Sequence, residues 1–172
     1  MKLPRFLLYP LHRRAEKLME SRGPDFIIGG KENPYLLRWW VIPRNRFFNI
    51  YLHLFKRSDD DRALHDHPWV NVSILLDGAY YEHTPKGSKK HLEGQVLFRR
   101  PTARHRIELV RQNIYSVVDR SHYRELPVLT LFITGPRVRE WGFWCSQGFV
   151  HWKDFVHPDD PGGIGPGCGE HP

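Results

Sequence analysis

Apolar and polar residues alternate over short segments through most of the chain, from Tyr35 to Trp144. These segments are rich in aromatic and β-branched residues, and residues that favour turns separate them. Because no helical periodicity lies between them, the pattern predicts an all-β domain, either an antiparallel sandwich or a barrel. The predicted strands are Tyr35–Ile42, Asn49–Phe55, Trp69–Leu76, Ala79–His83, Gln95–Phe98, Arg104–Val110, Tyr115–Val118, Val128–Ile133 and Trp141–Trp144.

The two ends of the chain follow other patterns. Near the N-terminus, apolar residues recur at helical spacing before a Gly-Pro pair, which predicts a short helix. Its apolar face is Leu11, Ala15, Leu18 and Met19. Residues 157–172 include nine glycines and prolines in sixteen positions, so we expect a disordered, flexible tail. The predicted organisation is a helical arm (1–34), a β-barrel (35–156) and this tail.

Composition and charge narrow the class of protein. The chain has 172 residues, with 26 basic and 19 acidic side chains and a net charge of +7. Its 40% apolar content excludes a disordered chain, and no apolar stretch approaches the ~20 residues that cross a bilayer. Because the basic residues are dispersed and match no nucleic-acid-binding motif, we expect neither a membrane nor a nucleic-acid partner.

Cysteine usage and the first residues indicate a compartment. Cys145 and Cys168 form no CxxC pair, and Cys168 lies in the predicted flexible tail, so we expect no structural disulfide. The opening apolar run is four residues long and ends at Pro10, which does not match a signal peptide. Both observations favour a reducing, cytoplasmic setting.

The chemistry of the chain centres on a His-x-His pair. His65 and His67 are two positions apart, so on a strand both imidazoles project from one face and can bind one metal ion. Asn71 and Ser73 follow at the same parity and share that face. Further along, His105 lies on another predicted strand and shares a face with Ile107 and Leu109, so we expect it to point into the apolar interior.

A carboxylate is expected beside these histidines. Asp77-Gly78 is typical of a two-residue β-hairpin, which would pair Ser73 with Glu82. Glu82 and Tyr80 would then face the same side as the histidines. Glu82 would act as a metal ligand or general base, or else would hold a ligand imidazole in one tautomer.

These residues resemble the first motif of the cupin family, small jelly-roll barrels built as a double-stranded β-helix. That motif joins a glycine, HxH, a glutamate and a second glycine at fixed spacing. Here His65, His67, Asn71 and Gly78 keep the spacing, with asparagine in place of the glutamate and no leading glycine.

The second cupin motif is matched more loosely. Gly94, Pro101 and His105 stand in the family's order, with altered gaps, and the resemblance spans roughly residues 49–144. Three segments also resemble cupin-like proteins encoded in phage and prophage. They are Tyr35–Trp39, His65–Trp69 and Thr134–Arg137 with Trp141–Phe143.

The resemblance implies a metal site made of His65, His67 and His105, with Asn71 where the family has a carboxylate ligand. Either the three histidines hold the metal and leave positions open, or Glu82 completes the site. We favour the three-histidine site, with Asn71 and Ser73 as hydrogen-bonding neighbours. Imidazole ligands suit iron, zinc, copper or nickel and do not choose between them. The expected cofactor is one divalent transition metal, namely iron, zinc, manganese or nickel.

For function, analogy with the fold implies an enzyme that acts on a small molecule, first of all a non-haem metal dioxygenase. A sugar or small-polar-ligand isomerase or epimerase, with Tyr80 as proton donor, is the second hypothesis. A non-catalytic ligand-binding or structural cupin is the third. Arg137 follows a Gly-Pro turn near the predicted barrel rim, where its guanidinium could contact an acidic substrate. We also expect a homodimer formed through an outer strand.

Overall fold

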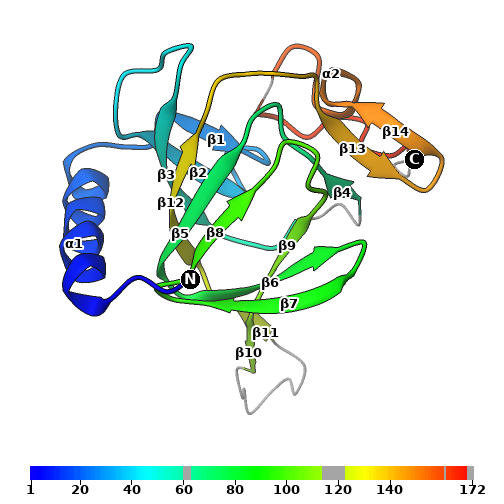
Figure 1. The fold of residues 1–172 in the computed structure, drawn as a ribbon. Helices are drawn as coiled ribbons and strands as arrows, with labels where there is room; N and C mark the ends of the chain where they lie inside the picture. Colours follow the sequence, from blue (N-terminus) through cyan, green and yellow to red (C-terminus); the bar gives the residue numbers. More distant parts are fainter. Residues whose placement is uncertain (60–62, 114–122, 161, 170–172) are drawn as a thin grey trace.

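The structure, a computed structural model, describes residues 1–59, 63–113, 123–160 and 162–169. Two helices and fourteen strands lie in this part of the chain (Figure 1). They are α1 (Arg5–Ser21), β1 (Phe26–Ile28), β2 (Leu36–Trp40), β3 (Asn49–Phe55), β4 (Leu64–His65), β5 (Asn71–Asp77), β6 (Ala79–Thr84), β7 (Gly87–Leu92), β8 (Val96–Arg99), β9 (Arg106–Leu109), β10 (Arg111–Asn113), β11 (Tyr123–Glu125), β12 (Val128–Thr134), β13 (Gly142–Cys145), β14 (Gly148–His151) and α2 (Trp152–Phe155).

Six antiparallel strands form the main sheet, in the order β1-β2-β3-β12-β5-β8. Smaller sheets are formed by β7-β6-β9, by β14-β13-β4 and by the pair β10-β11 (Figure 1). The fold is therefore mostly β, as the alternation of apolar and polar residues predicts. The backbone hydrogen bonds of the described strands divide them into four sheets, however, and do not join them in one closed barrel.

Helix α1 covers one face of the main sheet, as its apolar spacing predicts. Leu8 and Ala15 are buried there with Leu52 and Leu76 of the sheet. Burial of each such leucine side chain stabilises the fold by about 2 kcal/mol. Neither helix in the described residues is both long enough and apolar enough to span a membrane.

The opposite face of the main sheet packs against β6 and β9 around an apolar core. Its buried members are Leu36, Phe55, Leu75, Tyr80, Ile107, Leu109 and Val128. Residues two positions apart on a strand share a face, so the same inner face continues with polar side chains. On three strands a polar residue lies two positions from a core residue. These pairs are Arg38 with Leu36, His53 with Phe55, and Ser73 with Leu75. The apolar core thus gives way to a buried polar region.

The predicted hairpin across Asp77-Gly78 does not form. β5 pairs with β8 and β12, whereas β6 pairs with β7 and β9. Gly78 does adopt a positive φ of 82°, but it turns the chain from the main sheet into another sheet. The predicted pairing of Ser73 with Glu82 is therefore wrong, although Arg99 bonds to both side chains across the interior.

The expectation of free cysteines is also wrong. Cys145, at the end of β13, forms a disulfide with Cys168, and their Cα atoms lie 5.6 Å apart. Sequence spacing gave no hint of this contact, because the intervening chain passes through β14 and α2 before it returns. Disulfides persist mainly in oxidising environments, so the cysteines no longer support a cytoplasmic setting.

The described part of the C-terminal segment forms hydrogen bonds with the rest of the chain, so the structure gives no evidence for the expected flexible tail. The amide of Gly29 donates to the carbonyl of Gly162 at 2.8 Å, and that of Gly167 donates to Phe155 at 3.1 Å. A Cβ atom on Gly162 would lie 2.2 Å from the carbonyl oxygen of Ile27. Glycine therefore serves close backbone packing here rather than flexibility.

Eight of the predicted strands are confirmed, with shifted ends, as β2, β3, β5, β6, β8, β9, β12 and β13. The predicted strand Tyr115–Val118 lies outside the described residues. The sequence pattern missed short strands and β7, which is exposed and polar over Gly87–Lys90 and therefore shows no apolar alternation.

Candidate metal centre

Backbone pairing places His65 beside His105. Each residue donates its amide to the other's carbonyl at 2.9 Å, which forms an isolated antiparallel bridge just before β9. His67 is fixed nearby because its amide donates to the carbonyl of Pro101 at 3.2 Å. The structure thus brings together the three histidines that the sequence singles out.

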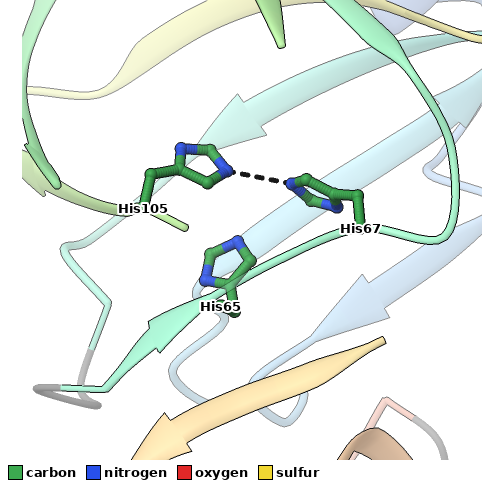
Figure 2. Close-up of side chains that lie close together, drawn as sticks. All are labelled: His65, His67 and His105. Atoms are coloured by element: carbon green, nitrogen blue, oxygen red, sulfur yellow. Dashed lines mark hydrogen bonds between the residues drawn. The ribbon is translucent and has the colours of Figure 1, made fainter. Parts of the chain in front are cut away.

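Their ring nitrogens converge (Figure 2). One nitrogen from each of His65, His67 and His105 lies within 4.8 Å of the other two. The shortest separation, between Nε2 of His67 and Nε2 of His105, is 2.9 Å. Nitrogens that bind one transition metal at about 2.0–2.2 Å lie about 3–4 Å apart, so this arrangement can hold a single ion.

The residue between the first two histidines anchors the segment. Asp66 points to the opposite side, where it is 1% exposed. Its carboxylate accepts hydrogen bonds from the amide of Gly142 at 3.1 Å and from Nε1 of Trp144 at 3.3 Å. Arg139 adds an ion pair at 2.8 Å. The imidazoles of His65 and His67 therefore point inward, whereas the side chain of Asp66, between them, points the other way and bonds to residues of β13.

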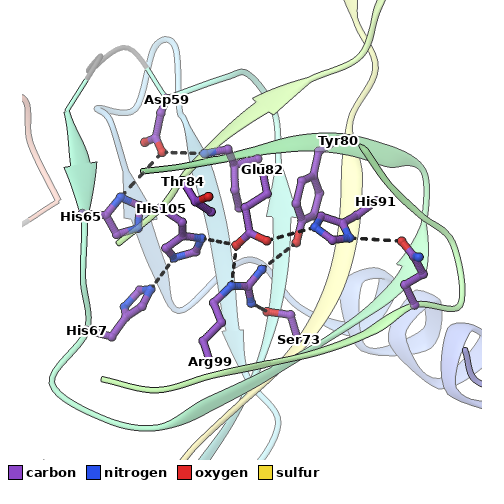
Figure 3. Close-up of polar contacts among 12 residues, drawn as sticks. Asp59, His65, His67, Ser73, Tyr80, Glu82, Thr84, His91, Arg99 and His105 are labelled. Carbon is purple, nitrogen blue, oxygen red and sulfur yellow. Dashed lines mark hydrogen bonds and ion pairs between the residues drawn. The ribbon is translucent and has the colours of Figure 1, made fainter. Parts of the chain in front are cut away.

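Glu82 is the hub of a buried network beside His105 (Figure 3). One carboxylate oxygen lies 2.6 Å from Nε of Arg99 and 2.8 Å from Nδ1 of His105, and the other lies 3.0 Å from Nε2 of His91. The contact with His105 is short but does not have the direction of an ideal hydrogen bond. Burial would raise the pKa of Glu82, but His105, His91 and Arg99 together hold it well below its usual range.

A second carboxylate faces His65. Oδ2 of Asp59 lies 3.9 Å from Nδ1 of His65 and accepts a hydrogen bond from the amide of Ile107 at 3.3 Å. Burial raises the pKa of Asp59 to about 6, although that hydrogen bond and the charge of His105 oppose the shift. Both His65 and His105 therefore turn Nδ1 towards a carboxylate.

Burial keeps the three imidazoles neutral. It lowers the pKa of His65 to about 4, and the positive charge of Arg99 acts in the same direction. It also lowers the pKa of His105 to about 4, although Glu82 opposes this shift. Burial and the neighbouring His65 hold the pKa of His67 well below 6.5. Neutral imidazole is the form that binds a metal.

The other residues predicted for the site have environments that differ from one another. Asn71 is 1% exposed, and neither its amide nitrogen nor its oxygen has a hydrogen-bond partner in the described residues. Ser73 and Tyr80 both bond to Arg99, at 2.9 and 3.1 Å, so their hydroxyl groups belong to the Glu82 network. Arg137 is half exposed and forms an ion pair with Glu140.

Aromatic rings surround the histidines. Trp69 stacks on His67 with ring centroids 5.2 Å apart, and Phe132 lies 5.8 Å from the same ring. Phe143 lies 5.7 Å from His65. A surface cavity of about 300 Å³ adjoins the network from another side, where β6 and β7 residues, among them Glu82 and His91, line it.

Sequence reasoning missed Asp59, His91 and Arg99. Arg99 is 6% exposed and pairs with Glu82 across two sheets. Strand parity relates residues within one strand or one hairpin, so it gives no signal for such contacts. Asp66 was within reach of the same parity argument, because it alternates with His65 and His67.

No protein-family model matches this sequence, and the comparison with curated proteins finds no match. Among solved structures, the chain is similar to a conserved protein with a double-stranded β-helix domain from Klebsiella pneumoniae, with 14% identity, a TM-score of 0.47, and coverage of 67% of this chain and 89% of that one. It is similar to a cupin superfamily protein from Desulfitobacterium hafniense at 15% identity and a TM-score of 0.44, with coverage of 63% and 84%.

An RmlC-like cupin from Shewanella frigidimarina has 14% identity and a TM-score of 0.44, with coverage of 65% of this chain and 85% of that one. All three scores lie below 0.5, so these similarities decide nothing about what this chain binds or does. The functional argument rests on its own residues.

Proposed function

We propose that this chain is a metal-binding cupin, in which His65, His67 and His105 hold one divalent transition metal. The observation that carries the proposal is the convergence of three neutral imidazoles, that of His105 buried and those of His65 and His67 partly buried, with one nitrogen from each within 4.8 Å of the others. Without a metal, one hydrogen bond joins two of the rings, between Nε2 of His67 and Nε2 of His105 at 2.9 Å, and a metal would satisfy all three imidazoles at once.

Carboxylates behind the histidines support the same assignment. Glu82 faces Nδ1 of His105, and Asp59 faces Nδ1 of His65. At 2.8 Å, the carboxylate of Glu82 favours the proton on Nδ1 of His105 and leaves the lone pair of Nε2 free for a metal, whereas Asp59, at 3.9 Å from His65, acts only through its charge. We therefore assign Glu82 a positioning role rather than that of general base or fourth ligand.

Asn71 is the chain's own candidate for contact with whatever occupies the remaining metal positions. Its buried amide has a free donor and a free acceptor among the described residues. Such a group stabilises a bound water molecule or substrate by hydrogen bonding, because burial without a partner costs about 1–3 kcal/mol. Asn71 would thus orient the ligand while the histidines hold the ion.

Three histidines leave coordination positions open for a small molecule. A bound iron ion would supply dioxygen chemistry there, and zinc, manganese or nickel would supply Lewis acidity. We place a dioxygenase acting on a small molecule first. The chain's residues would hold the ion, exclude bulk water through Trp69 and Phe132, and orient the substrate.

The epimerase hypothesis with Tyr80 as proton donor has less support. The Tyr80 side chain is 1% exposed, and its hydroxyl accepts a hydrogen bond from Arg99. Burial raises its pKa further above 10. A non-catalytic cupin, in which the metal braces the fold, remains the alternative that activity measurements decide.

A homodimer through an outer strand stays a proposal. β8 is the edge strand of the main sheet, and its Phe98 is 66% exposed. Met1 pairs with the first residue of β8, because the amide of Val96 donates to the carbonyl of Met1 at 2.9 Å. The exposed aromatic side chain of Phe98, further along this edge, is a surface that a second copy could cover. Light scattering of the wild type and of Phe98→Lys tests this, with a dimer expected only for the wild type; a monomeric wild type overturns it.

Cobalt(II) titration tests the metal site. Wild-type protein should give saturable visible absorption at one equivalent, and His67→Ala should abolish it. His83→Ala is the matched control, because His83 pairs with Glu108 away from the site at 2.8 Å. Absence of saturable absorption in the wild type would contradict the proposal. Oxygen uptake by iron-loaded protein, screened with thiols, phenols and keto acids, then separates a dioxygenase from a binding protein.

A further inference from the structure

Among the described residues, one arginine in the polar interior has no acidic partner. Arg38 lies on β2, opposite His53 of β3 and Phe26 of β1. It shares the inner face with the core residue Leu36, two positions earlier. Its side chain therefore points into the same interior as the histidine site, and not towards α1.

Neutral groups surround its guanidinium. Nε donates to Nε2 of His53 at 2.9 Å, and the guanidinium carbon lies 5.0 Å from the ring centre of Tyr51 and 6.0 Å from that of Phe26. Within the described residues, no carboxylate lies at ion-pair distance from Arg38. With Nε occupied, the two Nη groups are the donors that remain for a planar, bidentate contact.

The other arginines near this interior are compensated, which makes Arg38 unusual. Arg99 pairs with Glu82 at 2.6 Å, and Arg139 pairs with Asp66 at 2.8 Å. Arg38 instead has a second positive charge near it, that of Arg44. Burial lowers the pKa of Arg38 to about 10, and Arg44 adds to that shift, so Arg38 stays protonated at neutral pH. Arg38 is partly buried, and a charge in such a position without a counter-ion is destabilising, so a bound anion would relieve that cost.

A continuous series of contacts joins Arg38 to the histidine site. The His53 ring stacks on Phe132 with centroids 4.9 Å apart, and Phe132 lies 5.8 Å from His67. The charge of Arg38 is close enough to contribute to the lowered pKa of His67. The rings of His53 and Phe132 therefore lie between the guanidinium of Arg38 and the imidazole of His67.

We propose that Arg38 binds the anionic group of the substrate, a carboxylate or a phosphate, while the rest of that molecule reaches the three histidines. The anion site at Arg38 itself needs no metal. Only the second part of the proposal, in which the substrate also reaches the three histidines, rests on the proposed function. It names the substrate class: a small organic anion, with an apolar or aromatic body that packs against Phe132 and Tyr51. His53 acts as a positioning residue, since it fixes Nε and thereby aims the two Nη groups.

Calorimetric titration with simple probes tests the anion site. Benzoate, benzamide and inorganic phosphate are added to the purified protein, both after metal loading and after metal removal. Benzoate should bind about tenfold or more tightly than its neutral analogue benzamide, because a charged hydrogen bond contributes about 1.5–3 kcal/mol. Phosphate binding without benzoate binding would assign the site to phosphorylated substrates.

Substitutions locate the effect. Arg38→Gln should weaken benzoate binding about tenfold or more and leave benzamide binding unchanged. Arg13→Gln is the matched control, because Arg13 is exposed on α1 and pairs only at the surface with Glu16. If Arg38→Gln does not fold, two measurements still test the anion site. One is the comparison of benzoate with benzamide in the wild type. The other is benzoate binding by Arg38→Lys, which keeps the positive charge.

The outcomes separate the two proposals. Benzoate binding that depends on Arg38 in a protein that never takes up metal would keep the anion site and overturn the metal site. Equal binding of benzoate and benzamide by the wild type, with no phosphate binding, would overturn the anion site whatever the metal content. Unchanged benzoate affinity in folded Arg38→Gln would overturn it as well.

Discussion

The carboxylate of Glu82 lies 2.8 Å from Nδ1 of His105, on the side of the imidazole away from His67. The same carboxylate holds the buried guanidinium of Arg99 at 2.6 Å. One acidic group thus orients a proposed metal ligand and neutralises a buried cation. This double role makes the effect of its removal predictable.

Glu82→Gln should lower metal affinity about 10- to 100-fold, because the His105 ring loses its orienting carboxylate. It should also lower the free energy of unfolding by about 3 kcal/mol or more, since Arg99 is left without its counter-ion. Competition with a chelator and urea unfolding measure the two effects. The matched control is Glu108→Gln, whose pair with His83 lies partly exposed on the outer side. Unchanged metal affinity in Glu82→Gln would contradict the positioning role.

The stability of the metal-free protein should fall as the pH decreases from 7. His65 and His105 have folded pKa values of about 4, below 6.5, so the unfolded state binds protons first and gains free energy. Each histidine therefore lowers the stability by roughly 1 kcal/mol between about pH 7 and about pH 5.5. Asp59 acts in the opposite direction over this window and offsets roughly 1 kcal/mol, because its folded pKa of about 6 lies above its unfolded value.

His67 and His53, whose pKa values burial also lowers, add to the loss. Urea midpoints in the presence of a chelator should therefore decrease steadily over this window. Asp59→Asn should steepen the decrease, because the opposing group is gone. A stability that stays constant down to pH 5.5 would show that the imidazoles are not buried as described.

Reduction of the disulfide should destabilise the C-terminal segment without emptying the metal site. Cys145 and Cys168 are 23 residues apart, and a loop of this length predicts a loss of about 3 kcal/mol. Thermal unfolding of Cys168→Ser, compared with the oxidised wild type, measures it. Metal content should be the same in both. Identical melting of the wild type with and without reductant would argue that the bridge does not form.

Asp66→Asn should weaken metal binding from outside the site. Its carboxylate, 1% exposed, bonds to Gly142, Trp144 and Arg139, and those contacts fix the strand that carries His65. We expect a loss of stability of about 2–4 kcal/mol and weaker metal retention. Arg137→Gln is the comparison, since its surface ion pair contributes about 0–1 kcal/mol. An Arg137→Gln variant that alone abolishes activity would support the sequence prediction that Arg137 contacts the substrate.

The sequence pattern within single strands was enough to predict where several of the site residues lie. Two-residue alternation predicted that His65 and His67 share a side, and their ring nitrogens do converge, although β4 ends at His65. Ile107 and Leu109, at the same parity as His105, correctly predicted its burial. Glu82 was expected beside the histidines and is there, but through a false pairing. Asp77-Gly78 fixes a turn, and a turn alone does not decide whether its two strands pair or separate into facing sheets.

The rest depends on contacts between segments far apart in the chain. Asp59, Arg99 and Arg38 are ordinary charged residues by pattern, and only the stacking of two sheets buries them. The disulfide of Cys145 with Cys168 and the close backbone packing of Gly162 likewise follow from how the chain returns on itself. Composition predicted a flexible tail and therefore free cysteines, because the segment is rich in glycine and proline. Glycine permits close backbone packing as well as flexibility, and composition does not distinguish the two.

Metal content per chain tests the central claim most directly. The protein is purified without added metal or chelator and is then reconstituted under anaerobic conditions with iron, zinc, manganese or nickel. Its metal content is measured by elemental mass spectrometry. We predict close to one transition metal per chain for the wild type and for His83→Ala, and its loss when both His65 and His67 are replaced by alanine in a variant that stays folded. A folded wild type that retains none of these metals, or a double variant that retains as much as the wild type, would contradict the account.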